Sequence, residues 1–430
     1  MDAGKSSTLM SIKERLRTVI FWISPKPKAR SPKQRLGRLY GDEHQTPNSL
    51  HRTPRKIKNM KTGKVAVFTE AQTPMEFREY PIPSVTPDDL LVRISMANIC
   101  GSDLHFWRGH GPKIESGIPQ VLGHEMIGTI EAMGRNITMD SMGQPLTEGD
   151  RIAYSYFKPC QHCWVCLNGK PGCPNRYRDW LGVSSEQPPH FHGAYGEYYY
   201  MKPGHWVFKV PDALPDALVS PINCALSEVI YGLNQIGITL GDTVVIQGAG
   251  GLGLYATAVA KEMGAGKIIV FDRLPARLAL AQAFGADETL NVDEIDMKSR
   301  VEYVLDQTRG IGADLVAEFV GSPRVLAEGV EMLRWGGRYL WIGNINLGFP
   351  TEIDPGNIVR CSKAIRGVIV YEPWVIPRAL DFLSRTRDKY PFHKIISDTF
   401  SFSDINEAFS YADSGEAIRV GLEFDTPQVR

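Results

Sequence analysis

Apolar runs and helical patterns alternate along the second half of the chain. Runs typical of buried strands occupy residues 243–247, 267–271, 314–319 and 338–342. Residues 252–263 and 278–284 carry the apolar spacing of helices instead. Strands that alternate with helices in this way predict an α/β domain built on a parallel, doubly wound sheet.

The first half of the chain follows a different pattern. Short β-type runs at residues 64–68 and 90–95 are separated by several prolines, and similar runs continue to Phe208. This pattern predicts a compact β-barrel-like domain ahead of the α/β domain. A chain of 430 residues accommodates both, because single cores stop growing at about 250–300 residues. No apolar run reaches the roughly 18–20 residues that a membrane span needs.

Charge is distributed unevenly along the chain, although the formal net charge is zero. Residues 1–62 hold 15 basic and 4 acidic side chains, and the remainder is correspondingly acidic. No overall field therefore favours nucleic acid as a partner. We expect the basic segment, which is also rich in Ser and Pro, to be largely disordered. Residues 11–24 can form a short amphipathic helix, so the segment is either an organellar transit peptide or a plain unstructured extension.

Four of the seven cysteines lie within one short segment, as Cys160, Cys163, Cys166 and Cys173. This spacing lets one loop surround a tetrahedral ion with four thiolates, the closed ligand set of a structural zinc site. A redox dithiol is the alternative, but it leaves two cysteines unexplained. A metal-type cluster without a secretory signal also indicates a reducing compartment.

Two further residues need an assignment alongside this loop. His162 lies inside it, and with four thiolates present we expect its ring to face solvent. Cys361 has no partner at a useful spacing, so we expect it to be a core residue.

A glycine-rich turn follows the first strand of the α/β region and opens a helix. Gly248 permits the tight turn, Gly250 lets the backbone approach a pyrophosphate, and Gly253 allows the helix to pack close to the strand. The helix N-terminus then offers free N–H groups to the phosphates. The full context of strand, turn and helix predicts a dinucleotide site.

Asp272 ends the second strand of the α/β region, 24 residues after Gly248. A carboxylate there accepts hydrogen bonds from a ribose diol and repels a 2′-phosphate, which favours NAD over NADP. Arg273 works against this inference because an arginine can hold a phosphate. A solvated Asp at a strand end is the structural alternative.

Three other potential metal ligands are dispersed along the chain as Cys100, His124 and Cys224. Two thiolates and one imidazole would leave a fourth position open, as a catalytic zinc site requires. Taken singly, such a cysteine is usually a small core residue, and such a histidine is usually a turn residue or a hydrogen-bonded core residue. Spacing alone does not join them.

The ordered set of these motifs resembles the zinc-containing medium-chain dehydrogenases. The resemblance covers about residues 63–425 and includes Cys-Gly-Ser-Asp-x-His, Gly-His-Glu, the four-cysteine loop and the glycine turn. It implies a GroES-like β-barrel catalytic domain and a Rossmann dinucleotide-binding domain. We expect residues 63–224 to form the first, 225–369 the second, and 370–430 a return segment that completes the catalytic domain.

The resemblance also implies roles around a catalytic zinc ion. Cys100, His124 and Cys224 match its protein ligands, and Glu125 matches a carboxylate near the metal that assists ligand exchange. Asp103 matches the group that receives the N–H of the zinc-bound histidine and fixes its orientation.

Proton and cofactor roles are implied in the same way. Ser102 matches the hydroxyl that takes the alcohol proton, and His105 matches the far end of a relay to solvent. Arg419 matches an arginine that contacts the cofactor pyrophosphate.

Some features depart from the family pattern. Gly101 stands where some members carry a phosphate-binding arginine, and the four-cysteine loop is one residue tighter at its end than in many members. Insertions at residues 139–146 and 179–192, and the basic segment before Gly63, have no counterpart in the family core.

The function expected from this resemblance is hydride transfer between an alcohol and NAD, with two zinc ions per chain, one catalytic and one structural. A polyol- or threonine-type dehydrogenase is an alternative, and Cys224 in place of Glu leans against the polyol group. A non-catalytic sensor or scaffold that binds zinc and NAD is a second alternative. We expect a cytoplasmic homo-oligomer, a dimer or tetramer, that acts on a small-molecule alcohol, with organellar targeting by residues 1–62 left open.

Overall fold

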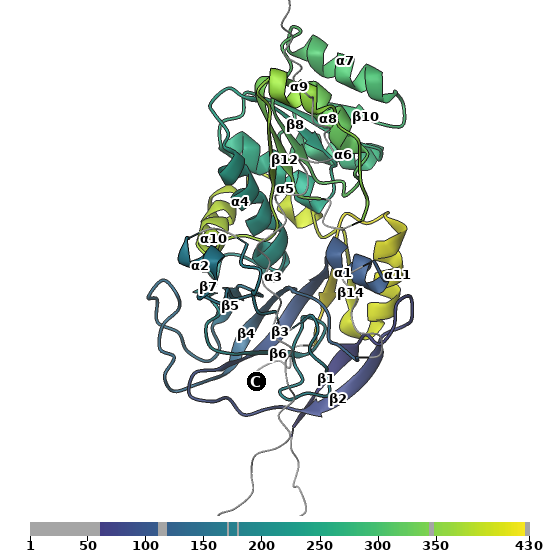
Figure 1. Ribbon diagram of the computed structural model, residues 1–430. Coiled ribbons are helices and arrows are strands. Elements are labelled where there is room, and N and C mark those ends of the chain that lie inside the picture. Colours follow the sequence, from purple (N-terminus) through teal and green to yellow (C-terminus); the bar gives the residue numbers. More distant parts are fainter. Residues whose placement is uncertain (1–60, 111–117, 170–171, 179, 344–347, 426–430) are drawn as a thin grey trace, which may run out of the picture. The chain divides into compact units, whose positions relative to one another are not determined.

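The computed structural model describes residues 61–110, 118–169, 172–178, 180–343 and 348–425 (Figure 1). The basic extension expected over residues 1–62 therefore lies outside the described part of the chain, apart from its last two residues. Within the described part, no helix is both long enough and apolar enough to span a membrane.

The α/β region contains a six-stranded sheet in the order β10–β9–β8–β11–β12–β13. Every neighbouring pair in this sheet is parallel, which confirms the doubly wound sheet predicted from the alternating pattern. The strands are β8 (Thr243–Gln247), β9 (Lys267–Asp272), β10 (Glu288–Asn291), β11 (Ala313–Glu318), β12 (Leu333–Trp341) and β13 (Ala364–Gly367).

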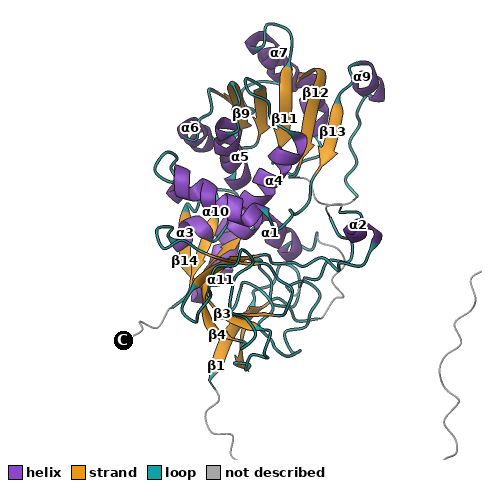
Figure 2. Ribbon diagram, turned by 90° about the vertical axis from the view of Figure 1, so that its left-hand side faces the viewer, coloured by secondary structure: helices purple, strands orange, loops and turns teal. Residues whose placement is uncertain are grey.

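Helices cover both faces of this sheet (Figure 2). They are α4 (Ser227–Ile236), α5 (Gly251–Glu262), α6 (Pro275–Ala283), α7 (Met297–Gln307), α8 (Val325–Met332) and α9 (Pro355–Arg360). Alternate side chains of one strand enter different cores: Val244 and Ile246 join the core that holds Leu254 of α5. Val245 joins the core that holds Val330 of α8. Burial on both faces explains why the strands are continuous apolar runs in the sequence.

The β-rich region is built on a seven-stranded sheet in the order β14–β15–β3–β4–β5–β7, with β6 attached to β3. All pairs except β14–β15 are antiparallel, and β1 and β2 form a separate two-stranded sheet. These strands are β1 (Thr62–Val67), β2 (Glu76–Pro81), β3 (Leu90–Ile99), β4 (Glu125–Met133), β5 (Arg151–Tyr154), β6 (Tyr198–Met201), β7 (Val207–Lys209), β14 (Asp398–Ser401) and β15 (Val420–Glu423).

Pairing between β15 and β3 joins the end of the chain to the first half. Val420 lies opposite Ile99 in this antiparallel pair. Arg419, just before β15, is therefore brought close to Cys100, just after β3. Further helices of the described chain are α1 (Gly101–Trp107), α2 (Trp164–Leu167), α3 (Asp216–Val219), α10 (Val375–Thr386) and α11 (Ile405–Ser414), of which α11 packs on β14 and β15 and α10 on α4.

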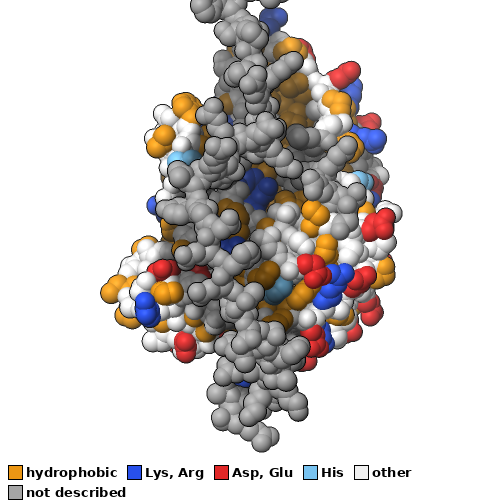
Figure 3. Space-filling model, turned by 60° about the horizontal axis from the view of Figure 1, so that its bottom comes forward, with side chains coloured by type: hydrophobic (Ala, Val, Ile, Leu, Met, Phe, Trp, Pro, Cys, Tyr) orange, Lys and Arg blue, Asp and Glu red, His pale blue; other side chains and the backbone are white. Residues whose placement is uncertain are grey.

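Charged side chains of both signs are interspersed with exposed apolar ones on the visible part of the face in Figure 3. Singly scattered exposed apolar groups are normal for folded proteins. Potential metal-ligand side chains gather in two buried or partly buried clusters.

Candidate metal and dinucleotide sites

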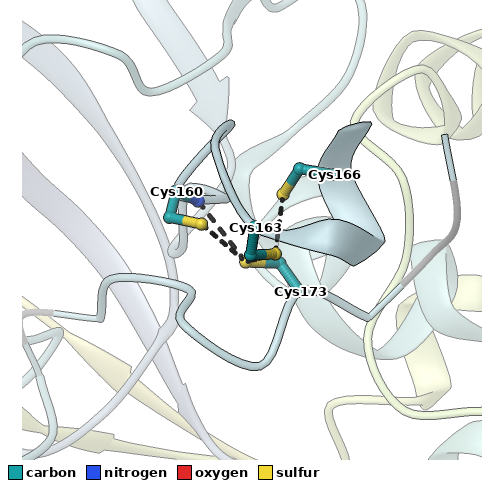
Figure 4. Close-up of side chains that lie close together, drawn as sticks. All are labelled: Cys160, Cys163, Cys166 and Cys173. Atoms are coloured by element: carbon teal, nitrogen blue, oxygen red, sulfur yellow. Dashed lines mark hydrogen bonds between the residues drawn. The ribbon is translucent and has the colours of Figure 1, made fainter. Parts of the chain in front are cut away.

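The four cysteines of the 160–173 loop converge on one point (Figure 4). Cys163 is the N-cap of α2 and Cys166 lies within that helix. Sulfur–sulfur distances are 3.6 Å for Cys163–Cys166 and Cys160–Cys173, and 3.8 Å for Cys163–Cys173. These sulfurs are too far apart for disulfides, whose S–S bond is about 2.05 Å.

The sulfur arrangement fits a tetrahedral zinc ion. Zn–S bonds of about 2.3 Å place tetrahedral sulfurs about 3.8 Å apart, which the three distances match. The backbone N–H of His162 lowers the pKa of Cys160 to about 6, which favours the thiolate that a metal needs. His162 is exposed, as expected.

Cys361 does not belong to the core. It is half-buried at the C-terminal end of α9, so the expectation of a core residue is wrong. The reason is that α9 buries none of its own residues, which leaves its end near the surface.

A second cluster brings together Cys100, His124, Glu125 and Cys224, all of them buried. Cys100 is the N-cap of α1, directly after β3, and Glu125 begins β4 with His124 just before it. Cys224 lies in a π-helical turn, Ile222–Leu226, that leads into α4. π-Helical turns inside helices often occur at functional sites. Three segments that are remote in sequence thus supply one potential metal site.

The donors of this cluster also fit zinc. The Sγ of Cys224 lies 3.4 Å from Nε2 of His124, and tetrahedral Zn–S and Zn–N bonds imply a separation of about 3.6 Å. Cys224 and His124 both lower the pKa of Cys100 well below its ordinary value, against the effect of burial. A thiolate at Cys100 suits a metal ligand.

Asp103 lies behind His124. Its Oδ1 is 3.3 Å from Nδ1 of the ring, an ion-pair distance without hydrogen-bond geometry. Its Oδ2 accepts hydrogen bonds from the backbone N–H of Cys100 at 3.0 Å and from the hydroxyl of Tyr195 at 2.8 Å. Burial alone would lower the pKa of His124, but Asp103 and Cys100 raise it above its ordinary value. The Nε2 atom is thereby turned towards the cysteines.

Ser102 and His105 both lie on α1, three residues apart, which puts them on one side of the helix. The hydroxyl of Ser102 is 3.5 Å from Nε2 of His124. Burial, followed by the charges of Arg108 and His110, lowers the pKa of His105. The ring centroids of His105 and His110 are 6.2 Å apart.

Glu125 and Arg419 form a buried ion pair. Burial raises the pKa of Glu125 to about 8, while Arg419 works in the opposite direction. A methyl group at Gly251, the first residue of α5, would lie 3.1 Å from Nε of Arg419. Arg419 therefore lies between the metal cluster and the N-terminus of the dinucleotide helix. The sequence carried no signal for its pairing with Glu125.

The glycine turn has the expected conformation. Gly248 adopts a φ of +99°, which favours glycine. A methyl group at Gly253 would lie 1.8 Å from the carbonyl oxygen of Gly248, so only glycine fits this helix–strand approach. Gly250, by contrast, has open space where a side chain would be. A cavity of about 520 Å³ adjoins the turn and is lined by Gly248, Gly250, Asp272 and Arg273, among others.

Asp272 faces this cavity with its carboxylate held by the backbone. It accepts hydrogen bonds from the N–H of Ala249 at 2.7 Å and of Leu274 at 2.9 Å. Arg273 is exposed beside it. The carboxylate therefore lies at the end of β9 next to the glycine turn, which is the arrangement that its predicted ribose contact needs.

Two aromatic rings that sequence reasoning did not assign lie against His124. The ring of Trp180 is stacked on it with centroids 4.4 Å apart, and that of Tyr156 lies at 4.7 Å. Trp180 belongs to the loop insertion at residues 179–192, for which the sequence offered no role. In the sequence, the one feature that could have pointed to Trp180 is an aromatic residue inside an otherwise unexplained loop.

Glu228 is another residue that sequence reasoning missed. It lies on α4, four residues after Cys224, and its Oε1 accepts a hydrogen bond from the N–H of Val370 at 2.8 Å. Burial raises the pKa of Glu228 to about 7. Val370 has a φ of +60°, a strained conformation for a β-branched residue that is typical of functional sites.

Comparisons with known proteins identify both halves of the chain. Residues 86–212 match the alcohol dehydrogenase GroES-like domain, and residues 251–385 match the zinc-binding dehydrogenase family. The chain is 32% identical to 5-exo-hydroxycamphor dehydrogenase of Pseudomonas putida over 84% of its own length and 98% of that protein.

Solved structures agree with these matches. An alcohol dehydrogenase from Thermotoga maritima is 30% identical, with a TM-score of 0.80 over 85% of this chain and 100% of that one. An alcohol dehydrogenase from Escherichia coli, solved with NADH, is 27% identical, with a TM-score of 0.70 over 84% and 99% of the two chains. This protein therefore belongs to the zinc-dependent alcohol dehydrogenases of the medium-chain dehydrogenase superfamily.

Proposed function

We propose that this protein oxidises an alcohol to an aldehyde or ketone with NAD as the hydride acceptor. The observation that carries the proposal is the ion pair between Glu125 and Arg419. It joins the Cys100, His124 and Cys224 cluster to the first turn of the dinucleotide helix, so that a metal-held alcohol and a nicotinamide would meet in one place.

Cys100, His124 and Cys224 would hold one zinc ion, and the four-cysteine loop would hold a second, structural one. When bound, zinc supplies a Lewis acid for the alcohol oxygen, and NAD supplies the hydride acceptor. The dinucleotide pyrophosphate would lie at the N-terminus of α5, between Gly250 and Arg419.

The chain's own residues would orient the reactants and move the proton. Asp103 orients His124. Ser102 accepts the alcohol proton, and His105 passes it on to solvent. Glu125 fixes the guanidinium of Arg419 beside the helix N-terminus. Trp180 and Tyr156 enclose His124 and keep water from it.

The preference for NAD over NADP rests on Asp272. Its carboxylate lies in the dinucleotide cavity and would accept hydrogen bonds from the ribose diol. Arg273 lines the cavity too, so the ratio of kcat/KM with NAD to that with NADP is the direct measurement.

The decisive experiment combines turnover with metal analysis. Purified protein is offered primary, secondary and polyol substrates while NADH absorbance is followed and zinc is measured per chain. We expect NADH formation and two zinc ions per chain. His124→Ala should lose one zinc and at least about 100-fold in kcat. A His124→Ala variant with full activity would contradict the zinc assignment. Two zinc ions without turnover on any substrate would favour the sensor or scaffold alternative.

Assembly and location remain proposals as well. We infer a dimer or tetramer, which light scattering of the purified protein tests. Free thiols in both ligand clusters suit a reducing compartment such as the cytoplasm. We also propose residues 63–224 and 370–430 as the catalytic domain and 225–369 as the dinucleotide-binding domain.

A further inference from the structure

The residue directly before Cys224 receives a hydrogen bond from a remote part of the chain. The hydroxyl of Tyr371 donates to the backbone carbonyl oxygen of Asn223. Both residues are buried, with 2% of Tyr371 and 0% of Asn223 exposed. The bond therefore joins the loop between β13 and α10 to the π-helical turn that carries Cys224.

This turn does not have the regular hydrogen bonds of an α-helix. The N–H of Leu226 donates to the carbonyl oxygen of Pro221 at 3.3 Å, five residues back instead of four. The N–H of Ser227 reaches the carbonyl oxygen of Ile222 in the same way. The side-chain amide of Asn223 is buried and has no hydrogen-bond partner among the described residues. We therefore expect contacts from outside the turn to help fix the direction of its side chains.

Tyr371 is itself held in place. The N–H of Val370, directly before it, donates to Oε1 of Glu228 at 2.8 Å. The ring of Tyr371 packs edge to face on Phe157 with centroids 5.2 Å apart, and on Tyr156 at 6.4 Å. A donor whose ring is already packed loses little conformational freedom when it makes its hydrogen bond.

The two links from this loop lie on either side of Cys224. Asn223 precedes it, and Glu228 follows four residues later on α4. The Sγ of Cys224 lies 3.4 Å from Nε2 of His124. A zinc ligand has to lie within about 0.2 Å of its ideal distance, so a small shift of the turn would weaken metal binding.

We propose that Tyr371 is a positioning residue, whose hydrogen bond to Asn223 holds the π-helical turn so that Cys224 serves as a zinc ligand. The inference rests on the proposed function, because it takes Cys100, His124 and Cys224 as the ligands of that zinc ion. Tyr371 acts through the backbone of Asn223 and not on the reacting atoms.

Tyr371→Phe tests the proposal because it removes the hydroxyl and keeps the ring. We expect zinc to bind about 10-fold more weakly at this cluster, as when other groups that orient a metal ligand are lost. Zinc affinity is measured by competition with chelators of graded strength, and the zinc retained per chain is counted at each step. The zinc ion of the four-cysteine loop is the internal reference and should be retained as in the wild type.

Tyr200→Phe is the matched control. Tyr200 is also buried, and its hydroxyl donates to Oδ2 of Asp89. It lies opposite Leu91, near the end of β3 that is remote from Cys100. Tyr200→Phe also removes one buried hydrogen bond, but it should keep the zinc affinity of the wild type. An equal loss of zinc affinity in Tyr200→Phe would indicate general destabilisation and overturn the proposal.

A double-mutant cycle tests whether Tyr371 acts through Cys224. Cys224→Ala should weaken zinc binding at the cluster, and Tyr371→Phe added to it should weaken zinc binding no further. Additive losses in the double variant, or wild-type zinc affinity in Tyr371→Phe, would overturn the proposal.

Cobalt(II) in place of the zinc ion of this cluster provides a spectroscopic readout. Its absorption depends on the thiolates that it binds, so the cobalt–thiolate absorption should decrease in Tyr371→Phe towards that of Cys224→Ala. It should be unchanged in Tyr200→Phe. An unchanged spectrum in Tyr371→Phe would overturn the proposal. None of these readouts needs turnover: if no alcohol of any class reduces NAD, the proposed function fails, while zinc affinity still decides the role of Tyr371.

Discussion

Asp103 connects three parts of the metal cluster through one buried carboxylate. One oxygen accepts hydrogen bonds from Cys100 and Tyr195, and the other faces Nδ1 of His124 at 3.3 Å. The imidazole can then present only Nε2 to a metal. Groups that orient a metal-bound histidine in this way tune its basicity and its direction.

We expect Asp103→Asn to reduce zinc affinity or kcat by about 10- to 100-fold. The amide has one acceptor oxygen, so it cannot accept from Nδ1 of His124 and from the backbone N–H of Cys100 as the two carboxylate oxygens do. Zinc content and NADH formation are measured together. Tyr195→Phe removes only one hydrogen bond to the same carboxylate and should have a smaller effect. Wild-type zinc content and kcat in Asp103→Asn would show that the carboxylate is dispensable.

Two glycines of the glycine-rich segment that joins β8 to α5 have different constraints: Gly250 in the turn and Gly253 in the first turn of α5. At Gly253 the packing of helix against strand leaves no room for a methyl group, because the carbonyl of Gly248 would be 1.8 Å away. At Gly250 nothing lies within 4 Å of the position that a methyl group would take. Gly253 is thus required by the fold, and Gly250 is free to contact a ligand.

Gly253→Ala should lower the free energy of unfolding by about 2–3 kcal/mol, as expected when a tightly packed site is overfilled. Gly250→Ala should change it by less than about 1 kcal/mol but weaken NADH binding, because the methyl group would lie in the path of the pyrophosphate. Urea unfolding and fluorescence titration with NADH measure the two effects. Equal NADH affinity in Gly250→Ala and the wild type would contradict the assigned role.

The four-cysteine loop has little apolar packing in its described residues. Helix α2, the one helix among them, has four residues and buries none of them. A metal would therefore supply much of its stability.

Cys163→Ser should remove one zinc per chain and lower Tm by roughly 5 °C or more, while the zinc at the other cluster remains. Metal analysis and thermal unfolding measure both effects. Cys361→Ser is the control because Cys361 lies outside both clusters. If Cys163→Ser keeps two zinc ions and an unchanged Tm, the loop is not a structural zinc site.

At the scale of the whole molecule, a buried histidine makes stability depend on pH. His192 is fully buried, and its Nε2 donates to the carbonyl of Gln187 at 2.8 Å, a hydrogen bond that raises the pKa of the ring but is outweighed by burial. Burial lowers the pKa of His192 to about 4, from about 6.5 in an unfolded chain. The unfolded state therefore binds more protons between these values, and stability falls as pH falls.

We expect His192 alone to cost up to about 3 kcal/mol of folding free energy between pH 6.5 and pH 4, with no effect above pH 7. His192→Gln keeps a donor for Gln187 and has no titration, so its stability should fall less steeply over this range. Urea unfolding of both proteins at pH 7.5, 6 and 5 gives the two slopes. Parallel slopes would exclude His192 as the source.

The elements that were predicted well are those whose residues are buried on both faces. The run at 243–247 coincides with β8, and 252–263 overlaps α5 almost entirely. β12 begins at Leu333, earlier than expected, because exposed Trp335 and two glycines interrupt its apolar pattern. Helix α7 gave no clear signal because Val304 is its only buried residue.

Sequence alone determined the four-cysteine loop and the glycine turn, because in both cases the chemistry lies within one short segment whose spacing sets its geometry. Tertiary structure decided the rest. Cys100, His124 and Cys224 meet only through the folding of β3, β4 and the π-helical turn, and Arg419 reaches Glu125 only because β15 pairs with β3. The surroundings of His124 and Tyr371 arise likewise from loops packed together. Contacts between remote segments depend on how whole sheets and loops pack, and no local pattern of residues encodes them.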